Sequence, residues 1–276
     1  MNDTYLSAED AVRNIQAQAR YVFTPEEFAR LTGRQPGSPA ANAALWRLRA
    51  AGRIVSVLKR PAKWLIVPPE HEHFGAPPVD WWLHDCLFDV APDYYVGLLS
   101  AARHWGSSHY ARQTTQVMVN SRRVNQTIGK LRIEYIWKSH TEQTPVVEAT
   151  TQVSRLRVST REATLLDLIR HQELIGGLEA IARVTHDFRD HLSAPALLAA
   201  LNAMGQAPPA QRLGVIFEIL HHEEMANQVR AWLDKRTLRT IILEGTGAGG
   251  ENKRQTNKRW SVSYIPSQLQ ALEELT

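Results

Sequence analysis

The stretch that decides the fold is residues 24–67, TPEEFARLTGRQPGSPAANAALWRLRAAGRIVSVLKRPAKWLIV. At Thr24-Pro25 and again at Ser38-Pro39, a hydroxyl residue and a proline precede helix-forming residues. This pattern is typical of a helix start, because the hydroxyl accepts a hydrogen bond from a free backbone N–H and proline suits the first helical position. The sequence therefore predicts two short helices here, which end near Gly33 and Gly52.

Two strand-like runs follow the second helix. Residues 53–58 read RIVSVL and residues 63–67 read KWLIV, and the turn between them has a basic tip. Upstream, residues 8–19 place apolar side chains at helical spacing. The order helix, helix, turn, helix and hairpin predicts a winged helix-turn-helix over residues 1–69.

The distribution of charge favours the same interpretation. The whole chain of 276 residues has a formal net charge of +4. Residues 1–69 hold ten basic and five acidic side chains, a net +5, which leaves the other 207 residues at −1. A basic segment beside a near-neutral one is typical of a nucleic-acid-binding module. The alternative is a solvated basic surface without a partner.

The second predicted helix carries most of the candidate site. One side of it is apolar and is expected to pack on the other helices, while the opposite side is expected to enter a major groove. The basic tip of the hairpin would contact the phosphate backbone or the minor groove. The candidate DNA-binding residues are Ser38, Asn42, Ala43, Trp46, Arg47 and Arg49 on the helix, and Lys59, Arg60 and Lys63 on the hairpin. In the alternative, the two helix arginines are merely solvated and Trp46 packs against the next domain.

The rest of the chain is predicted as a linker over residues 70–79, which is rich in proline, and a mixed α/β domain over residues 80–276 with a helical C-terminal part. The fold class expected overall is α+β. Helices are expected at 80–88, 94–105, 160–171, 177–190, 193–204, 209–222 and 225–236. Strands are expected at 114–119, 131–137, 145–150 and 154–159, and the segments 238–243 and 260–265 are expected to form a closing hairpin around a long loop.

No catalytic constellation is evident in the sequence. Gly106-Ser107 lacks the two following carboxylates with which a nucleotidyltransferase holds its metals. The glycine-rich residues 245–250 lack the Lys-Ser/Thr ending of a phosphate loop, although basic residues after them leave a phosphate contact open. Glu162 and Asp167 are interpreted as capping or solvent-exposed side chains, and Cys86 as core. We expect no enzyme activity, no cofactor and no metal.

The motifs YYVGLLSAA at 94–102, HWG at 104–106, QVMV at 116–119 and STREATLLDL at 159–168 resemble the AbiEi family of antitoxins. These are the antitoxin half of type IV bacterial toxin–antitoxin and phage-defence systems. The resemblance implies a transcriptional repressor that binds inverted repeats in the promoter of its own operon. It also implies that the larger domain counters a nucleotidyltransferase-like toxin, without a stable direct complex.

The expected partners are therefore double-stranded DNA and, functionally, the toxin. The expected location is the cytoplasm, since the chain starts without a signal-peptide pattern and has no apolar run long enough to span a bilayer. The alternative function is a protein–protein neutraliser or adaptor whose winged helix does not bind DNA.

Overall fold

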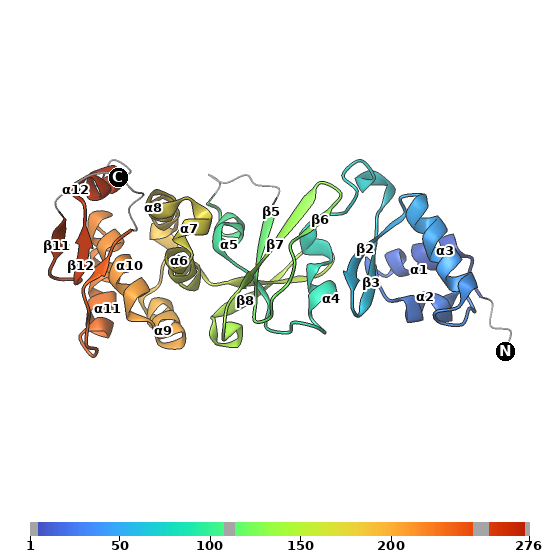
Figure 1. The fold of residues 1–276 in the computed structure, drawn as a ribbon, viewed down its shortest axis with the longest axis horizontal. Helices are drawn as coiled ribbons and strands as arrows, with labels where there is room; N and C mark the ends of the chain where they lie inside the picture. Colours follow the sequence, from blue (N-terminus) through green and yellow to red (C-terminus); the bar gives the residue numbers. More distant parts are fainter. Residues whose placement is uncertain (1–4, 108–113, 245–253, 274–276) are drawn as a thin grey trace. The chain divides into compact units, whose positions relative to one another are not determined.

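The computed structural model describes residues 5–107, 114–244 and 254–273, and it shows an α+β protein (Figure 1). The chain forms two compact units. The first comprises residues 1–95, 112–139 and 148–157, and the second comprises residues 96–111, 140–147 and 158–276.

The first unit begins with three helices and a small antiparallel sheet. The helices are α1 (Ala8–Ala17), α2 (Pro25–Leu31) and α3 (Pro39–Ala50), and the strands β1 (Val22–Phe23), β2 (Ile54–Lys59) and β3 (Ala62–Ile66) lie in the order β1-β3-β2. The predicted helices and hairpin are present, and β1 is an addition. Thr24 and Ser38 cap α2 and α3 as the sequence indicates, because each hydroxyl accepts a backbone N–H at 3.2 Å.

These elements close over an apolar core. Val12 of α1, Phe28 of α2, Ala44 of α3 and Leu65 of β3 are all fully buried. The three helices and the hairpin thus each contribute to one core, as their apolar spacing predicts.

The predicted linker is held against a hairpin of the first unit. It contains two short 3-10 helices, η1 (Pro69–His71) and η2 (Val79–Trp81), and precedes α4 (Leu83–Leu87). Gly75 packs on Gly129 so closely that a Cβ on Gly129 would lie 2.0 Å from the carbonyl oxygen of Phe74. The backbone N–H of Lys130 donates to that same carbonyl at 2.8 Å.

A six-stranded mixed sheet follows, in the order β6-β7-β5-β4-β9-β8. Its strands are β4 (Tyr95–Val96), β5 (Thr114–Val119), β6 (Gln126–Ile128), β7 (Leu131–Trp137), β8 (Val146–Thr150) and β9 (Arg155–Ser159). All four predicted strands are present, and β5 runs parallel to β7 from Thr114↔Arg132 to Val119↔Trp137. β6 forms an antiparallel hairpin with β7.

Residues 94–105 correct a prediction, because they do not form one helix. The segment starts as β4, in which Val96 pairs with Val158 of β9, and becomes helical at α5 (Leu98–His104). Tyr95 and Val96 are both buried. Aromatic and β-branched residues favour a pleated sheet, and a short apolar run leaves helix and strand indistinguishable by period.

The second unit is mainly helical. Besides α5 it contains α6 (Arg161–Arg170), α7 (Gln172–Ile175), α8 (Gly177–Phe188), α9 (Ala194–Met204), α10 (Ala207–Ile219), α11 (Glu223–Leu233) and α12 (Pro266–Glu273). The predicted C-terminal helices are present, with α12 in addition.

The predicted closing hairpin is wrong. β10 (Ile241–Ile242) runs parallel to β12 (Val262–Tyr264), and the antiparallel partner of β12 is β11 (Gln255–Asn257), in the segment expected to be loop. Gln211 fixes this sheet, since its buried amide donates to the carbonyl oxygens of Arg239, Trp260 and Ser261 at 2.8–3.2 Å.

Candidate nucleic-acid interface

The first unit contains a long segment without negative charge. Residues 28–69 include no Asp or Glu, and they include eight Lys or Arg side chains. This segment comprises most of α2 and all of α3, β2 and β3. A surface of one sign attracts a polyanion, because the fields of its charges add.

Three of the acids that precede this segment lie close to arginines. Asp10 binds Arg13 at 2.7 Å, and Glu27 binds Arg20 through both carboxylate oxygens at 2.6 and 3.0 Å. Glu9 lies 3.7 Å from Arg53 at the end of the α3–β2 turn. Both acids of α1 and one of the two acids of α2 are therefore close to a cation, and Glu26 of α2 is exposed.

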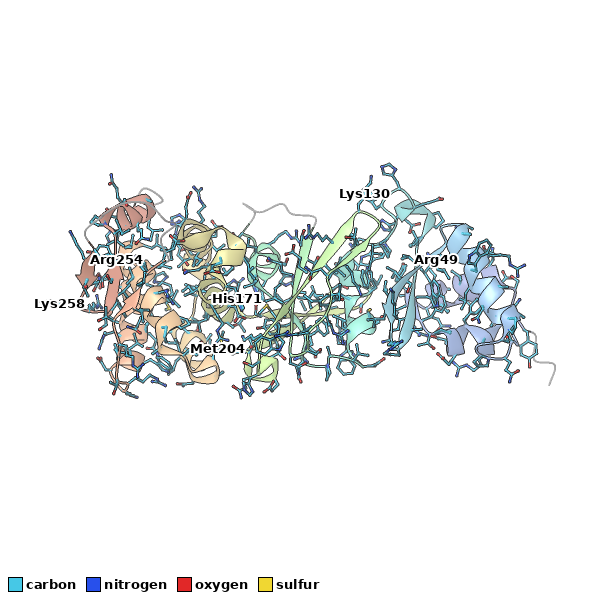
Figure 2. All side chains as sticks on the ribbon, in the orientation of Figure 1. Arg49, Lys130, His171, Met204, Arg254 and Lys258 are labelled. Carbon is cyan, nitrogen blue, oxygen red and sulfur yellow. The ribbon has the colours of Figure 1, made fainter. Side chains whose placement is uncertain are left out.

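Helix α3 exposes the side that the sequence predicts. Ala41, Ala44, Leu45 and Leu48 are buried, whereas Asn42, Ala43, Trp46, Arg47 and Arg49 are exposed (Figure 2 labels Arg49). Within the described residues, the guanidinium groups of Arg47 and Arg49 have no hydrogen-bond or ion-pair partner. Both side chains are thus available to a phosphate or to a base edge.

Two polar groups at the start of α3 have local partners. The Ser38 hydroxyl accepts from the backbone N–H of Ala41 at 3.2 Å, and the Asn42 amide donates to the carbonyl of Gly37 at 3.2 Å. Ser38 therefore acts as the helix cap, and the Asn42 side chain is held back toward the turn.

The hairpin tip presents two of its three predicted cations. Lys59 pairs in register with Ala62, and Arg60 follows at the turn. Both Lys59 and Arg60 are exposed. The basic tip of the hairpin is therefore formed by these two side chains.

The structure corrects the placement of Lys63. Its side chain is 4% exposed, and its ammonium donates to the carbonyl oxygens of Asp85 and Cys86 at 2.8 and 3.2 Å and to the carboxylate of Asp89 at 2.8 Å. The Lys63 ammonium thus donates to three acceptors near the end of α4 and has almost no contact with solvent. Lys63 therefore stabilises the attachment of the hairpin to α4 and does not belong to the exposed basic surface.

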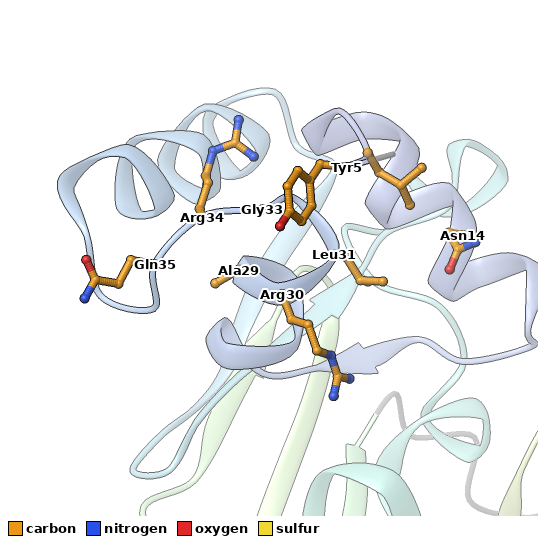
Figure 3. A pocket seen from close by; sticks show the side chains of 9 residues that line it. Tyr5, Asn14, Ala29, Arg30, Leu31, Gly33, Arg34 and Gln35 are labelled. Atoms are coloured by element: carbon orange, nitrogen blue, oxygen red, sulfur yellow. The ribbon is translucent and has the colours of Figure 1, made fainter. Parts of the chain in front are cut away.

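An open hollow lies beside α2 in the same module (Figure 3). Its volume is about 690 Å³, and Arg30, Arg34 and Gln35 are among its lining residues. Tyr5 covers Gly33 there, since a Cβ on Gly33 would come 2.4 Å from the tyrosine ring. Gly33 has φ +63°, which suits the predicted helix end. Arg30 and Arg34 are two of the eight cations of the acid-free segment.

The buried acids of α6 correct a second expectation. Glu162 is 4% exposed and Asp167 is 0% exposed, so neither is a solvent-exposed side chain. The Glu162 carboxylate accepts the backbone N–H of Ser193 at 3.0 Å, at the start of α9. The Glu162 carboxylate thus joins α6 to the start of α9.

Other groups with chemical potential are accounted for by packing. Cys86 is buried, as expected, and burial raises the pKa of its thiol to about 12. Across the parts of the chain that the structure describes, no three His, Cys, Asp or Glu side chains are grouped so that they could hold a metal ion. The glycine-rich residues 245–250 lie outside the described residues, and the basic residues Arg254 and Lys258 that follow them are exposed (Figure 2).

Comparison with known protein families gives a match for residues 95–219. Residues 95–219 match the family model of the AbiEi antitoxin C-terminal domain. The resemblance to the AbiEi antitoxins is thereby confirmed over these residues, and it supports an antitoxin role with a toxin as the general partner. No curated protein matches the sequence.

A solved structure is similar over nearly the whole chain. The crystal structure of the RV2827C protein from Mycobacterium tuberculosis superposes with a TM-score of 0.65 at 17% sequence identity, and the match covers 95% of this chain and 93% of that one. At this identity the likeness concerns the fold alone.

Among the described residues, no helix is both long and apolar enough to cross a membrane.

Proposed function

We propose that residues 1–69 form a winged helix-turn-helix that binds double-stranded DNA, and that the protein represses its own toxin–antitoxin operon. In this proposal α3 lies in the major groove, and the β2–β3 hairpin is the wing. The observation that carries it is the exposed, acid-free face of α3, on which neither Arg47 nor Arg49 has a hydrogen-bond or ion-pair partner among the described residues. The exposed Lys59 and Arg60 of the hairpin add two further cations.

The antitoxin half of the proposal rests on the match of residues 95–219 to AbiEi antitoxins. We propose that residues 80–276, reached through the linker 70–79, counter a nucleotidyltransferase-like toxin encoded in the same operon, and that they do so without a stable complex. The protein would act in the cytoplasm, as a phage-defence component, without catalysing a reaction or using a cofactor or metal.

The repressor function is tested in cells with a reporter gene under the protein's own promoter. The full chain is expected to lower reporter expression, and Arg47→Ala is expected to relieve that repression. Arg13→Ala is the matched control, because it removes the same charge from the same module at a side chain that Asp10 already pairs. Equal repression by all three proteins would contradict a role for α3.

The antitoxin function is tested by co-expression with the toxin gene of the operon. The wild-type chain and Arg47→Ala are both expected to restore growth when expressed from an unrelated promoter, because neutralisation is assigned to the other domain. Failure of the wild type to restore growth would contradict the antitoxin proposal without affecting the DNA-binding one. If growth is restored but no DNA is bound, the adaptor function replaces the repressor function.

A further inference from the structure

We propose that Trp46 is a specificity-determining residue that reads the methyl group of thymine in the major groove. This inference rests on the proposed DNA binding by α3 and adds to it the base that the helix selects. Arginine, asparagine and glutamine commonly recognise base edges in the major groove, and here an apolar side chain would recognise a base.

The position of Trp46 on α3 supports this role. At about 100° per residue, Trp46 lies in the middle of the exposed face. Arg49 lies about 60° to one side of it and Arg47 about 100° to the other. A groove centred on Trp46 would thus have a cation on each of its walls, where the phosphates are.

The neighbours of Trp46 allow a close approach. Pro39, Ala43 and Ala50 all lie within about 60° of it on the helix surface. All three are exposed and small. These three side chains all lie on the Arg47 side of the indole. They leave the indole as the most prominent group of that side, so the helix backbone can approach the groove there.

The indole of Trp46 is not used for folding. It is 68% exposed, and within the described residues it makes no ring contact and no hydrogen bond. By contrast, the fully buried Trp82 and Trp260 donate through their indole nitrogens to the carbonyl of Pro77 and to the carboxylate of Glu218. Most of the indole surface of Trp46 is therefore open to a partner.

The side chains on the exposed face of α3 favour thymine over the other bases. The C5-methyl group of thymine is the apolar feature of the major groove, and an apolar side chain contacts it favourably. Helix α3 contains no Asp or Glu to accept the amino group of cytosine. The Asn42 amide already donates to the carbonyl of Gly37. Trp46 is therefore the large side chain at the centre of the exposed face of α3 that is available to contact a base.

Charge favours DNA over a protein as the occupant of this face. An apolar stripe is also suitable for a protein contact, but the stripe lies within 42 residues that carry eight cations and no acid. A surface of this kind fits a polyanion that exposes methyl groups between its phosphates. The major groove of a thymine-containing duplex has both properties.

The test uses the protein's own promoter fragment prepared in two forms, one with thymine and one in which every thymine is replaced by uracil during synthesis. The replacement removes all the methyl groups and keeps base pairing. Wild-type protein is expected to bind the uracil fragment more weakly, by about fourfold for each methyl group that it contacts. Trp46→Ala is expected to bind both fragments equally, at about the affinity of the wild type for uracil DNA.

Arg47→Ala is the control for altered DNA shape. It is expected to bind more weakly than the wild type on both fragments and to keep the full loss on uracil substitution. Equal binding of the two fragments by the wild type would overturn the assignment of Trp46 while leaving DNA binding intact. A loss on uracil DNA that persists in Trp46→Ala would overturn it as well. Absence of specific binding to the thymine fragment would instead overturn the proposed function, and the inference with it.

Discussion

Lys63 and Asp89 form an ion pair of 2.8 Å in which the lysine side chain is 4% exposed and the aspartate side chain is 68% exposed. The pair joins the β2–β3 hairpin to the end of α4, where the same ammonium also binds two backbone carbonyls. A lysine that the sequence places in a basic tip is therefore an anchor.

Lys63→Met is expected to lower the free energy of unfolding by about 2 kcal/mol, because it leaves the buried carbonyl oxygen of Cys86 and the part-buried one of Asp85 without this donor. The exposed Asp89 is solvated and adds little. Urea denaturation measures the change, with Lys59→Met as the matched control, which is expected to be close to neutral. If Lys59→Met were the more destabilising of the two, the anchoring role of Lys63 would be wrong.

Lys59 and Arg60 at the hairpin tip are expected to affect DNA binding and not stability, in contrast to Lys63. Lys59→Ala and Arg60→Ala should leave stability unchanged and weaken DNA binding equally for all sequences, because contacts to phosphate carry no base information. Each should reduce the salt slope of binding by about one, since each contact releases about one counterion. Titrations at several salt concentrations measure this slope, and an unchanged slope in both variants would exclude the tip from the interface.

Gly214→Ala is expected to destabilise the second unit, although alanine is the better helix former. A Cβ at this position of α10 would lie 2.2 Å from the ring of Trp260, which is fully buried. The overpacking should cost about 2 kcal/mol, which exceeds the gain of about 1 kcal/mol in helix propensity. Thermal or urea unfolding measures the net effect.

A second variant isolates the cause of that effect. Adding Gly214→Ala to Trp260→Leu should cost much less than adding it to the wild type, since leucine leaves room for the new methyl group. Equal cost in both backgrounds would mean that the indole is not the obstacle.

Stability is expected to depend on pH through His84. Burial lowers the pKa of His84, and nearby Arg155 lowers it further. Below the ordinary value of about 6.5, the unfolded chain takes up a proton that the folded chain resists, so stability falls as the pH falls toward the lowered pKa. Above that ordinary value, His84 makes no contribution.

His84→Gln removes this titration. The decrease in unfolding free energy between about pH 7.5 and about pH 5.5 should therefore be smaller in the variant than in the wild type. Denaturation at the two pH values measures it. An equal decrease in both proteins would assign the pH dependence to other groups.

Local signals in the sequence predict the N-terminal elements well. Thr24-Pro25 and Ser38-Pro39 start helices because capping and proline geometry are decided within a few residues. The exposed face of α3 follows from its period, and Trp46 and Arg47 lie on it as expected.

Contacts between distant residues account for what the sequence does not predict. Lys63 and Leu65 share one face of β3, and this alternation was the available signal that Lys63 points inward. Its acceptor Asp89, 26 residues away, has no local signature. Similarly, β11 is a polar edge strand that is placed by pairing with β12, and its composition indicates a loop.

The central claim is sequence-specific DNA binding through α3, and a gel-shift titration of the full chain tests it most directly. The protein's own promoter is compared with scrambled DNA of equal length and composition, at about 50 and about 200 mM salt. We expect the wild type to prefer the promoter and to bind more weakly at the higher salt. Arg47→Ala is expected to bind the promoter more weakly than the wild type and to show a smaller preference for it, whereas Arg13→Ala is expected to match the wild type. Equal affinity of the wild type for promoter and scrambled DNA would contradict the account.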